Sequence, residues 1–417
     1  MVKTPLFLSA LICAVLLYSG LVPVKKTHPF RSLAPKHEIV RLTGTVRSNP
    51  VKVSDTLYRA VLSVDDAGTQ NGVYSSQGRV TLLFPKPLVE AYYPGKLYTA
   101  AHKKAQNGLF IENGARLSLS VTLVRTEQGS ELVYRVHSGN MLGWSGSALV
   151  RAVHHFRALC RLQFKRLMYA WGNAGGLLLA LLSGSREYTE KAVAEGFKNA
   201  GVSHILALSG MHVGLFGGIA LALGKKATGR HAADALQLAA ISFFVWFAGL
   251  SPSLFRAFLA ALILYFNSLL RMNRPDKLSL LSACFLIHAV AFPSHIHEAA
   301  FMLSYASLAG ILVFARLFRS YVPVFFPHKV RCALADSTAA TLTTSPVTAA
   351  LFQKIMPMGI IATVIVSPLV IFFLYLGLFG VIICLILPFL SVPFSAIMNA
   401  LYLLIKKSVL FFSFSKE

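Results

Sequence analysis

The sequence predicts a polytopic α-helical membrane protein with an all-β, OB-fold-like extracytoplasmic domain near its N-terminus, and three observations lead to this fold class. Mean hydropathy is +0.62, and 55% of the 417 residues are hydrophobic while 13% are charged, which is too apolar for an ordinary soluble domain. Long apolar runs fill most of the chain after Val202. Between about residues 38 and 138, short alternating segments separated by Gly, Asn, Pro and Asp are typical of strands and turns.

The first apolar run, Pro5 to Val24, follows Met-Val-Lys and is about long enough to span a bilayer. A cleaved signal peptide is the alternative, but no small-x-small cleavage site stands out. We therefore expect residues 1–24 to form a transmembrane anchor. Residues 38–138 hold roughly five to seven short predicted strands, a number that fits a small barrel of the OB type or a sandwich. The sequence leaves both β architectures open.

Residues 146–184 predict basic amphipathic helices that lie at a lipid interface. Segment 148–171 mixes Arg and Lys with Leu, Phe, Val, Met and Trp, and it contains no acidic residue. This composition is typical of helices that lie flat on a membrane. The basic side chains expected to face the membrane are Arg151, Arg157, Arg161, Lys165 and Arg166.

Residues 202–413 predict a multi-span membrane domain. The candidate spans are 203–224, 232–250, 252–270, 278–293, 299–318, 335–352, 355–376, 377–395 and 396–413. Loops after the first, third and fifth spans are rich in Lys and Arg, whereas Gly249–Pro252 and Pro293–His297 contain neither. The positive-inside rule then predicts cytoplasmic basic loops and a β domain outside. Basic residues between Lys25 and Lys36 disagree, but long domains translocate largely regardless of flanking charge.

The formal net charge of +24 has two interpretations, because basic cytoplasmic loops and nucleic-acid partners both favour Lys and Arg. The five cysteines are scattered without a CxxC pair, so neither a zinc knuckle nor a disulfide framework is predicted. The sequence contains no phosphate-binding Gly-rich loop, paired carboxylates or acid-rich metal cluster. We therefore predict no ATPase, polymerase or nuclease chemistry, no metal and no cofactor.

Polar residues inside apolar spans are the candidate functional residues. His204, Ser209 and His212 cluster in one segment, where they either line water or hydrogen-bond between helices. Three glycines in the same segment, at four-residue spacing, predict close helix packing: Gly210, Gly214 and Gly218.

Arg256 is the only ionisable residue of its span. A central Arg costs roughly 2.5–3.5 kcal/mol on insertion scales, so it either snorkels to the surface or contacts an anion at a pore mouth. Ser304, Thr341 and Ser345 place hydroxyl groups in later spans. These hydroxyls either line water or bond to carbonyls of the preceding helical turn.

Taken in order, these motifs resemble ComEC-type competence proteins, which pass transforming DNA as a single strand through the cytoplasmic membrane. AGVSHILALSGMHVGLFGG, 200–218, is similar to the family signature, and four other stretches are similar in the family's order. They are LLSGSREYTEKAVAEGFKNAG, 181–201; GLSPSLFRAFLAALI, 249–263; FMLSYASLAGIL, 301–312; and STAATLTTSPVTAALF, 337–352. The family usually has Leu where Met211 stands, and often has Asn where Thr363 stands.

The resemblance implies a channel for single-stranded transforming DNA in the cytoplasmic membrane, with an OB-fold module outside. It makes the polar residues of the matched motifs candidates for the DNA path or for helix packing: His204, Ser209, His212, Arg256, Ser304, Thr341 and Ser345. The basic helix of residues 148–171 would face the membrane or DNA. Five aromatic residues would either stack on bases or form ordinary barrel core: Tyr58, Phe84, Tyr92, Tyr93 and Phe110.

The sequence ends at Glu417, without the C-terminal metallo-β-lactamase-like domain that many members carry. We therefore expect no nuclease activity in this chain, and we expect other DNA-uptake proteins and a separate nuclease among its partners, besides the lipid bilayer. Two other functions stay open. One is an intramembrane serine protease that uses Ser209 and a His, and the other is a membrane assembly protein that transports nothing.

Overall fold

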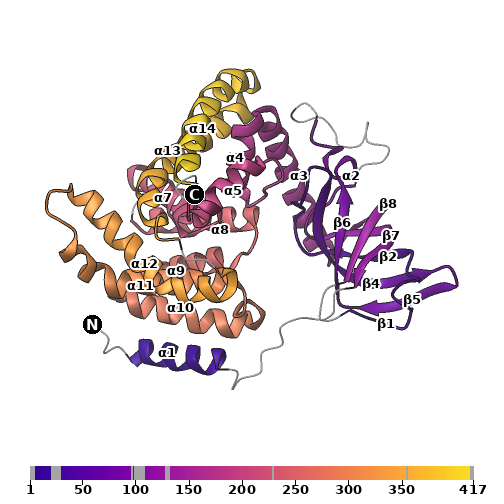
Figure 1. Cartoon of the computed structure of the whole chain (residues 1–417), viewed down its shortest axis with the longest axis horizontal. Helices are drawn as coiled ribbons and strands as arrows, with labels where there is room; N and C mark the ends of the chain where they lie inside the picture. The colour runs from indigo at the N-terminus through magenta and orange to yellow at the C-terminus, as the bar shows by residue number, and fades with distance from the viewer. Residues whose placement is uncertain are drawn as a thin grey trace.

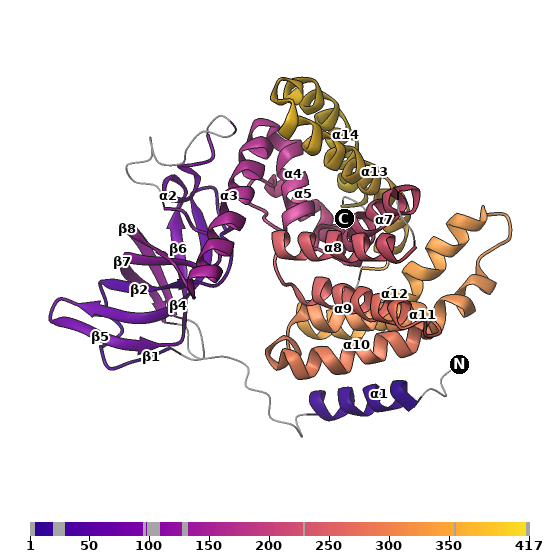
Figure 2. The same ribbon diagram turned by 180° about the vertical axis from the view of Figure 1, so that it is seen from behind.

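The computed structural model describes residues 5–19, 30–94, 97, 109–126, 132–227, 230–353 and 356–413. A β domain lies at one end of the molecule, and α3 (Ala148–Ala170) connects it to a helical bundle (Figure 1). The same arrangement is seen from behind in Figure 2. This architecture confirms the predicted polytopic helical protein with an N-terminal β domain.

The β domain contains one sheet of eight strands, which follow the alternating segments of the sequence. They are β1 (Arg31–Ser32), β2 (Arg41–Val46), β3 (Val51–Lys52), β4 (Leu57–Thr69), β5 (Gly72–Gln77), β6 (Arg79–Pro85), β7 (Ala115–Thr126) and β8 (Leu132–Trp144). Strand β2 pairs with β4 and β7, β4 with β6, and β7 with β8, all antiparallel. The parallel pair β6–β8 closes the ring, so the domain is a five-stranded barrel of the OB type and not a sandwich.

The barrel core consists of the inward-facing residues of these strands together with several aromatic rings. Tyr58 and Phe84 are fully buried and Tyr93 is 5% exposed, so in this structure these three rings are core and do not offer a face to bases. Tyr92 and Phe110 are half-buried, and their rings meet edge to face with centroids 5.9 Å apart. The short helix α2 (Lys86–Glu90) lies between β6 and β7 in the sequence.

The helical half follows most of the predicted spans. Its other helices are α1 (Pro5–Tyr18), α4 (Gly172–Ser183), α5 (Lys191–Asn199), α6 (Ser203–Leu206), α7 (Gly210–Ala227), α8 (Arg230–Ala248), α9 (Pro252–Leu269), α10 (Lys277–Ala291), α11 (Ala299–Tyr321), α12 (His328–Phe352), α13 (Gly359–Ile386) and α14 (Ser391–Ser413), with short 3-10 turns at Pro293–His295 and Pro388–Leu390. Among the described residues, five helices are long and apolar enough to cross a membrane: α8, α9, α11, α13 and α14. Helices α1, α4 and α10 are shorter but also apolar.

Three of the predicted span boundaries are wrong. One is the predicted break between residues 395 and 396, which lies inside α14. The predicted span 203–224 is divided, because the chain is extended at Ala207 between α6 and α7. The predicted break between residues 376 and 377 does not exist, since α13 continues through it for 28 residues in all. That helix ends at Ile386 because the following Leu387 precedes Pro388 and is held out of the helical conformation.

Helix α1 packs on α10, and the hydroxyl of Tyr18 donates to the carbonyl of Ile296 at 3.0 Å. The carboxyl end of α1 therefore lies beside the turn between α10 and α11. Residues 1–4 and 20–24 of the predicted anchor lie outside the described residues.

Helix α3 is oriented differently from the prediction, because most of its basic side chains point into the protein. Arg161 and Lys165 are 1% and 2% exposed, and Arg157 and Arg166 are also buried, whereas Arg151 is exposed. The opposite face of the helix carries exposed apolar side chains, including Leu149 and Phe156. Among the five basic residues expected at the membrane or DNA, only Arg151 is therefore accessible in this structure.

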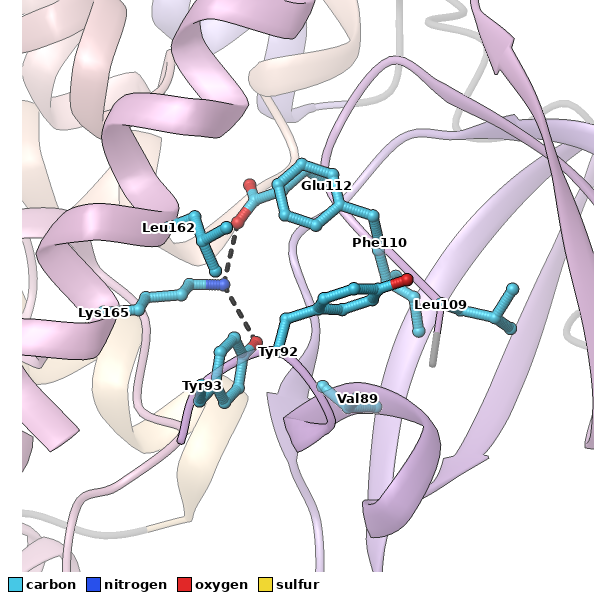
Figure 3. Close-up of a pocket in the computed structure, with 9 residues that line it drawn as sticks. Val89, Tyr92, Tyr93, Leu109, Phe110, Glu112, Leu162 and Lys165 are labelled. Carbon is cyan, nitrogen blue, oxygen red and sulfur yellow. Dashed lines mark hydrogen bonds and ion pairs between the residues drawn. The ribbon is translucent and has the colours of Figure 1, made fainter. Parts of the chain in front are cut away.

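The buried cations of α3 join the barrel to the bundle through one carboxylate. Arg161 Nε donates to Glu112 Oε2 at 2.9 Å, and Lys165 Nζ donates to Glu112 Oε1 at 2.8 Å. Lys165 Nζ also lies 2.9 Å from Oε1 of Glu187, and it donates to the hydroxyl of Tyr93 at 3.2 Å. Figure 3 shows Lys165 reaching from α3 between Glu112 and Tyr93. The cavity beside it measures about 10 Å³, the lower limit for one water molecule.

The same cations also bind the end of a membrane helix. Arg161 Nη1 and Arg157 Nη2 donate to the carbonyl of Phe247 at 2.9 and 3.4 Å. Phe247 lies in the last turn of α8, where helical carbonyls lack intrahelical partners and the helix dipole is negative. The barrel is thereby fixed at the carboxyl end of α8.

We predict that Glu112→Gln destabilises the folded chain by about 3–5 kcal/mol, because it leaves Arg161 buried without a counter-ion and Lys165 with Glu187 alone. The measurement is thermal unfolding of the full chain in detergent. Glu195→Gln is the matched control, since Glu195 is exposed and its pair with Lys191 spans 3.9 Å at the surface. We call the contact of Glu112 with Arg161 and Lys165 the junction. Equal unfolding temperatures for the two variants would contradict its role in stability.

The junction should also depend on pH. Burial raises the pKa of Glu112, but Arg161 and Lys165 outweigh burial and lower it from the ordinary value of 4.5 to about 2. Because the folded-state pKa is the lower one, the stabilisation is complete above about pH 4.5 and is lost as pH falls toward about 2. We expect the stability difference between the parent chain and Glu112→Gln to shrink across that window, and a constant difference would contradict this.

Candidate anion site at the start of helix α7

Helix α7 begins inside the helical half, directly after the extended residue Ala207. The backbone N–H of Ser209 donates to His212 Nδ1 at 3.2 Å, and the N–H of His212 donates to the Ser209 carbonyl at 3.1 Å. This reciprocal arrangement is a variant of the capping box, in which the third helical side chain accepts from the capping residue. Ser209 and His212 thus allow α7 to start here.

The imidazole of His212 offers a buried donor. Because Nδ1 accepts the N–H of Ser209, a neutral ring carries its proton on Nε2. The residue is 1% exposed, and Nε2 has no hydrogen-bond partner among the described residues. A buried donor of this kind is costly unless a ligand or water accepts its proton.

Arg256, in the second turn of α9, lies against the start of α7. A β-carbon at Gly210 would be 3.4 Å from Arg256 Nη2. The guanidinium donates to the carbonyl of Ser304 on α11, and its carbon atom lies 5.8 Å from the centroid of the Tyr305 ring. Within the described part of the chain, Arg256 forms no ion pair with a carboxylate.

A hydrogen-bonded group of side chains holds the Tyr305 ring in place. Its hydroxyl donates to the Cys284 carbonyl at 3.0 Å and lies 3.2 Å from His288 Nδ1. His288 is fully buried, and its Nε2 lies 3.1 Å from His295 Nδ1. Sequence reasoning missed His288, although an ionisable residue inside the predicted span 278–293 was a signal for it.

Two kinds of donor lie near Gly210, the positive end of α7 and the guanidinium of Arg256. The first turn of α7 also carries the buried Nε2–H of His212. The Ser304 hydroxyl adds a buried oxygen that has no partner among the described residues. Because no carboxylate neutralises Arg256, this arrangement suits an anion such as a phosphate group.

The geometry of Ser209 and His212 favours a structural role over nucleophilic catalysis. The Ser209 hydroxyl lies 3.3 Å from His212 Nδ1, the separation of a weak dyad. That nitrogen already accepts the backbone N–H of Ser209, so it is not free to take the hydroxyl proton. The residues that the structure describes also contain no group of three or more His, Cys, Asp or Glu able to hold a metal.

The structure brings together Ser209, His212, Arg256 and Ser304 but not the other three candidates. His204 lies exposed on α6. On α12, the Ser345 hydroxyl donates to the Thr341 carbonyl at 2.6 Å, so this hydroxyl is bonded within its own helix. A hydrogen bond between α11 and α12 comes instead from Thr343, whose hydroxyl donates to the Ala306 carbonyl at 2.9 Å.

The predicted packing glycines also need correction. Gly210 lies against Arg256, but β-carbons at Gly214 and Gly218 would meet nothing within 4 Å. The close approach to α8 uses another face of α7, where a β-carbon at Gly224 would lie 2.8 Å from the Cα of Ala233. Spacing alone could not show which face of α7 meets its neighbour.

The anion site and the barrel lie at the same end of the bundle. The Phe247 carbonyl that binds Arg161 is followed after a short loop by α9, which carries Arg256 in its second turn. The loops at this end, 249–252 and 293–297, contain no Lys or Arg.

Comparison with known proteins gives one family and one relative. Residues 181–415 match the family model described as "Competence protein", and this range contains the whole anion site. ComE operon protein 3 of Bacillus subtilis (strain 168) is 29% identical over 145 residues, which are 34% of this chain and 19% of that protein. The match thus spans less than two thirds of that relative's length. No solved structure matches the chain.

We predict that Gly224→Ala separates α7 from α8 and destabilises the chain by roughly 1–3 kcal/mol, because the new methyl meets backbone atoms of Ala233 that cannot move aside. Gly214→Ala is the matched control on the same helix. It should leave stability unchanged or raise it by up to about 1 kcal/mol through helix propensity. Thermal unfolding of both variants measures the difference, and the reverse order would refute this packing.

Proposed function

Because the chain belongs to the Competence protein family, we propose that it is a channel that carries single-stranded transforming DNA across the cytoplasmic membrane. The family supports a role in DNA uptake during competence. The observation that carries the finer proposal is Arg256, a guanidinium at the start of α7 that has no carboxylate partner among the residues that the structure describes.

The anion site suits a strand that must move. A phosphate can replace the Ser304 carbonyl as acceptor for Arg256 while the α7 start and His212 donate from the other side. When a phosphate leaves, the Ser304 carbonyl can again accept from Arg256. The site can therefore bind and release successive phosphates while the guanidinium always has an acceptor. Such recognition ignores base sequence, as a route for arbitrary DNA requires.

The charge distribution of the loops supports a barrel outside the cell. The barrel lies at the end of the bundle whose loops lack Lys and Arg. Basic residues gather in the loops at the other ends of these helices, as the positive-inside rule requires for the cytoplasmic side. The bond from Tyr18 to Ile296 is consistent with this orientation, because it brings the carboxyl end of α1 to the outer end and its start to the inner end.

The outer face of the barrel supports a first contact with DNA. In the register of the sheet, Leu83 of β6 lies between Arg59 of β4 and Arg135 of β8. Both arginines are exposed, and neither forms an ion pair among the described residues. Barrels of the OB type bind oligonucleotides on this region of the sheet, with cations along the backbone of the strand.

We expect Arg256→Ala to lower DNase-resistant uptake of end-labelled DNA by at least about tenfold, since a lost charged hydrogen bond is worth roughly 1.5–3 kcal/mol. DNA bound at the cell surface should stay at the parent level. Arg256→Lys keeps the charge but loses the bidentate donor, so uptake by this variant should lie between that of the parent and that of Arg256→Ala.

The matched control is Arg274→Ala, which removes the same charge from an exposed loop. Its uptake should equal that of the parent at equal protein level. Normal uptake by Arg256→Ala would refute the channel and favour a role in assembly alone. Cleavage of a membrane substrate that Ser209→Ala abolishes would instead favour the protease alternative.

A further inference from the structure

Helices α11 and α12 form a hairpin whose connecting turn lies at the end of the molecule opposite the barrel (Figures 1 and 2). Three large side chains at this tip face outward. Tyr321 is 76% exposed, Val324 is 81% exposed and Phe325 is 92% exposed. Val324 and Phe325 lie between Pro323 and Pro327, whose rings restrict the backbone. The Phe325 ring is therefore presented on a stiff turn.

Four cations surround the tip, and no acid neutralises them. Arg316 and Arg319 lie near the end of α11, and Lys329 and Arg331 lie near the start of α12. The sequence contains no Asp or Glu from residue 299 to residue 335. Within the described residues, none of the four forms an ion pair.

Two of these cations have unused donors. Arg331 Nη2 donates to the Arg319 carbonyl at 3.3 Å, which ties the two helices together below the tip. The Nε atoms of both arginines are buried and have no hydrogen-bond partner among the described residues. A buried guanidinium donor without an acceptor favours binding of an anion.

Resting on the function proposed above, we propose that this tip is a binding site for single-stranded nucleic acid on the exit side of the channel. Bases stack on the rings of Tyr321 and Phe325, and phosphates pair with the surrounding Arg and Lys side chains. Stacking tolerates any base because every base has a π-face, which suits DNA of arbitrary sequence.

The dimensions of the hairpin favour nucleic acid over lipid. With 23 residues, α11 is about 34 Å long, which exceeds the roughly 30 Å hydrocarbon core. The tip therefore extends past the apolar layer into the region where an emerging strand would pass. Arg256, which lies beside Ser304 near the other end of α11, contacts the strand before the tip does.

The direct test places a reporter at the tip of the full chain. We suggest the variant Phe325→Trp in nanodiscs of phosphatidylethanolamine and phosphatidylglycerol. The measured quantity is the Trp fluorescence of the variant minus that of the parent protein. Oligo-dT should quench this added fluorescence. Quenching by brominated lipid and not by oligo-dT would put the tip in the bilayer and overturn the proposal, as would no quenching by either. Val290→Trp, an exposed position on α10, is the control for lipid contact.

Substitutions at Phe325 separate base stacking from apolar contact in cells. Phe325→Tyr keeps the aromatic face and should take up DNA like the parent. Phe325→Leu keeps an apolar side chain without that face, and DNase-resistant uptake should fall about fivefold, the equivalent of about 1 kcal/mol per stacked base. Parent-level uptake by Phe325→Leu at equal protein level, with Arg256→Ala defective, would overturn the tip site alone. If Arg256→Ala also took up DNA normally, the channel itself would be refuted.

Discussion

One carboxylate, that of Glu112, decides how the two halves of this molecule are joined. It accepts hydrogen bonds from Arg161 and Lys165, whose side chains are almost completely buried. Removing such charges from water costs several kcal/mol each, and only close counter-charges offset that cost. Since Arg161 also binds Ser185 and the last turn of α8, the barrel, the α4–α5 loop and the membrane helices share one set of contacts.

The same physics distinguishes the cations that hold the structure from those available to a ligand. Arg161 and Lys165 have a carboxylate within hydrogen-bonding distance, whereas Arg256 has a carbonyl and an aromatic face. A carbonyl is a weaker acceptor for a guanidinium than a carboxylate or a phosphate, so an arriving phosphate gains by replacing it. The arrangement of counter-charges, and not the number of basic residues, therefore indicates where a polyanion would bind.

Much of this fold follows from the sequence, because hydropathy and alternation are local properties. They predicted the β domain and most of the helices. Polar residues inside apolar spans also drew attention to Ser209, His212 and Arg256, which the structure places at the starts of α7 and α9. Hydropathy and alternation could not predict which face of α3 is buried, because an apolar face turned outward and a basic face turned inward give the same composition as the reverse. Contacts such as Gly224 with Ala233, or His288 with Tyr305, join separate segments and require coordinates. The continuity of α13 was missed because an unbroken apolar run does not show where one helix ends and the next begins.

The parallel pairing of β6 with β8 bears on how the chain is made. Residues 81–83 find their partners only at 133–135, so the ring cannot close until β8 has been synthesised. Contacts of such long sequence separation form late, because loop-closure entropy opposes them until both strands are present. Arg161 and Lys165 follow β8 directly in the chain, so the side chains that dock the barrel emerge from the ribosome only after the last strand that completes it. All strands of the barrel are thus synthesised before the side chains that attach it to the helices.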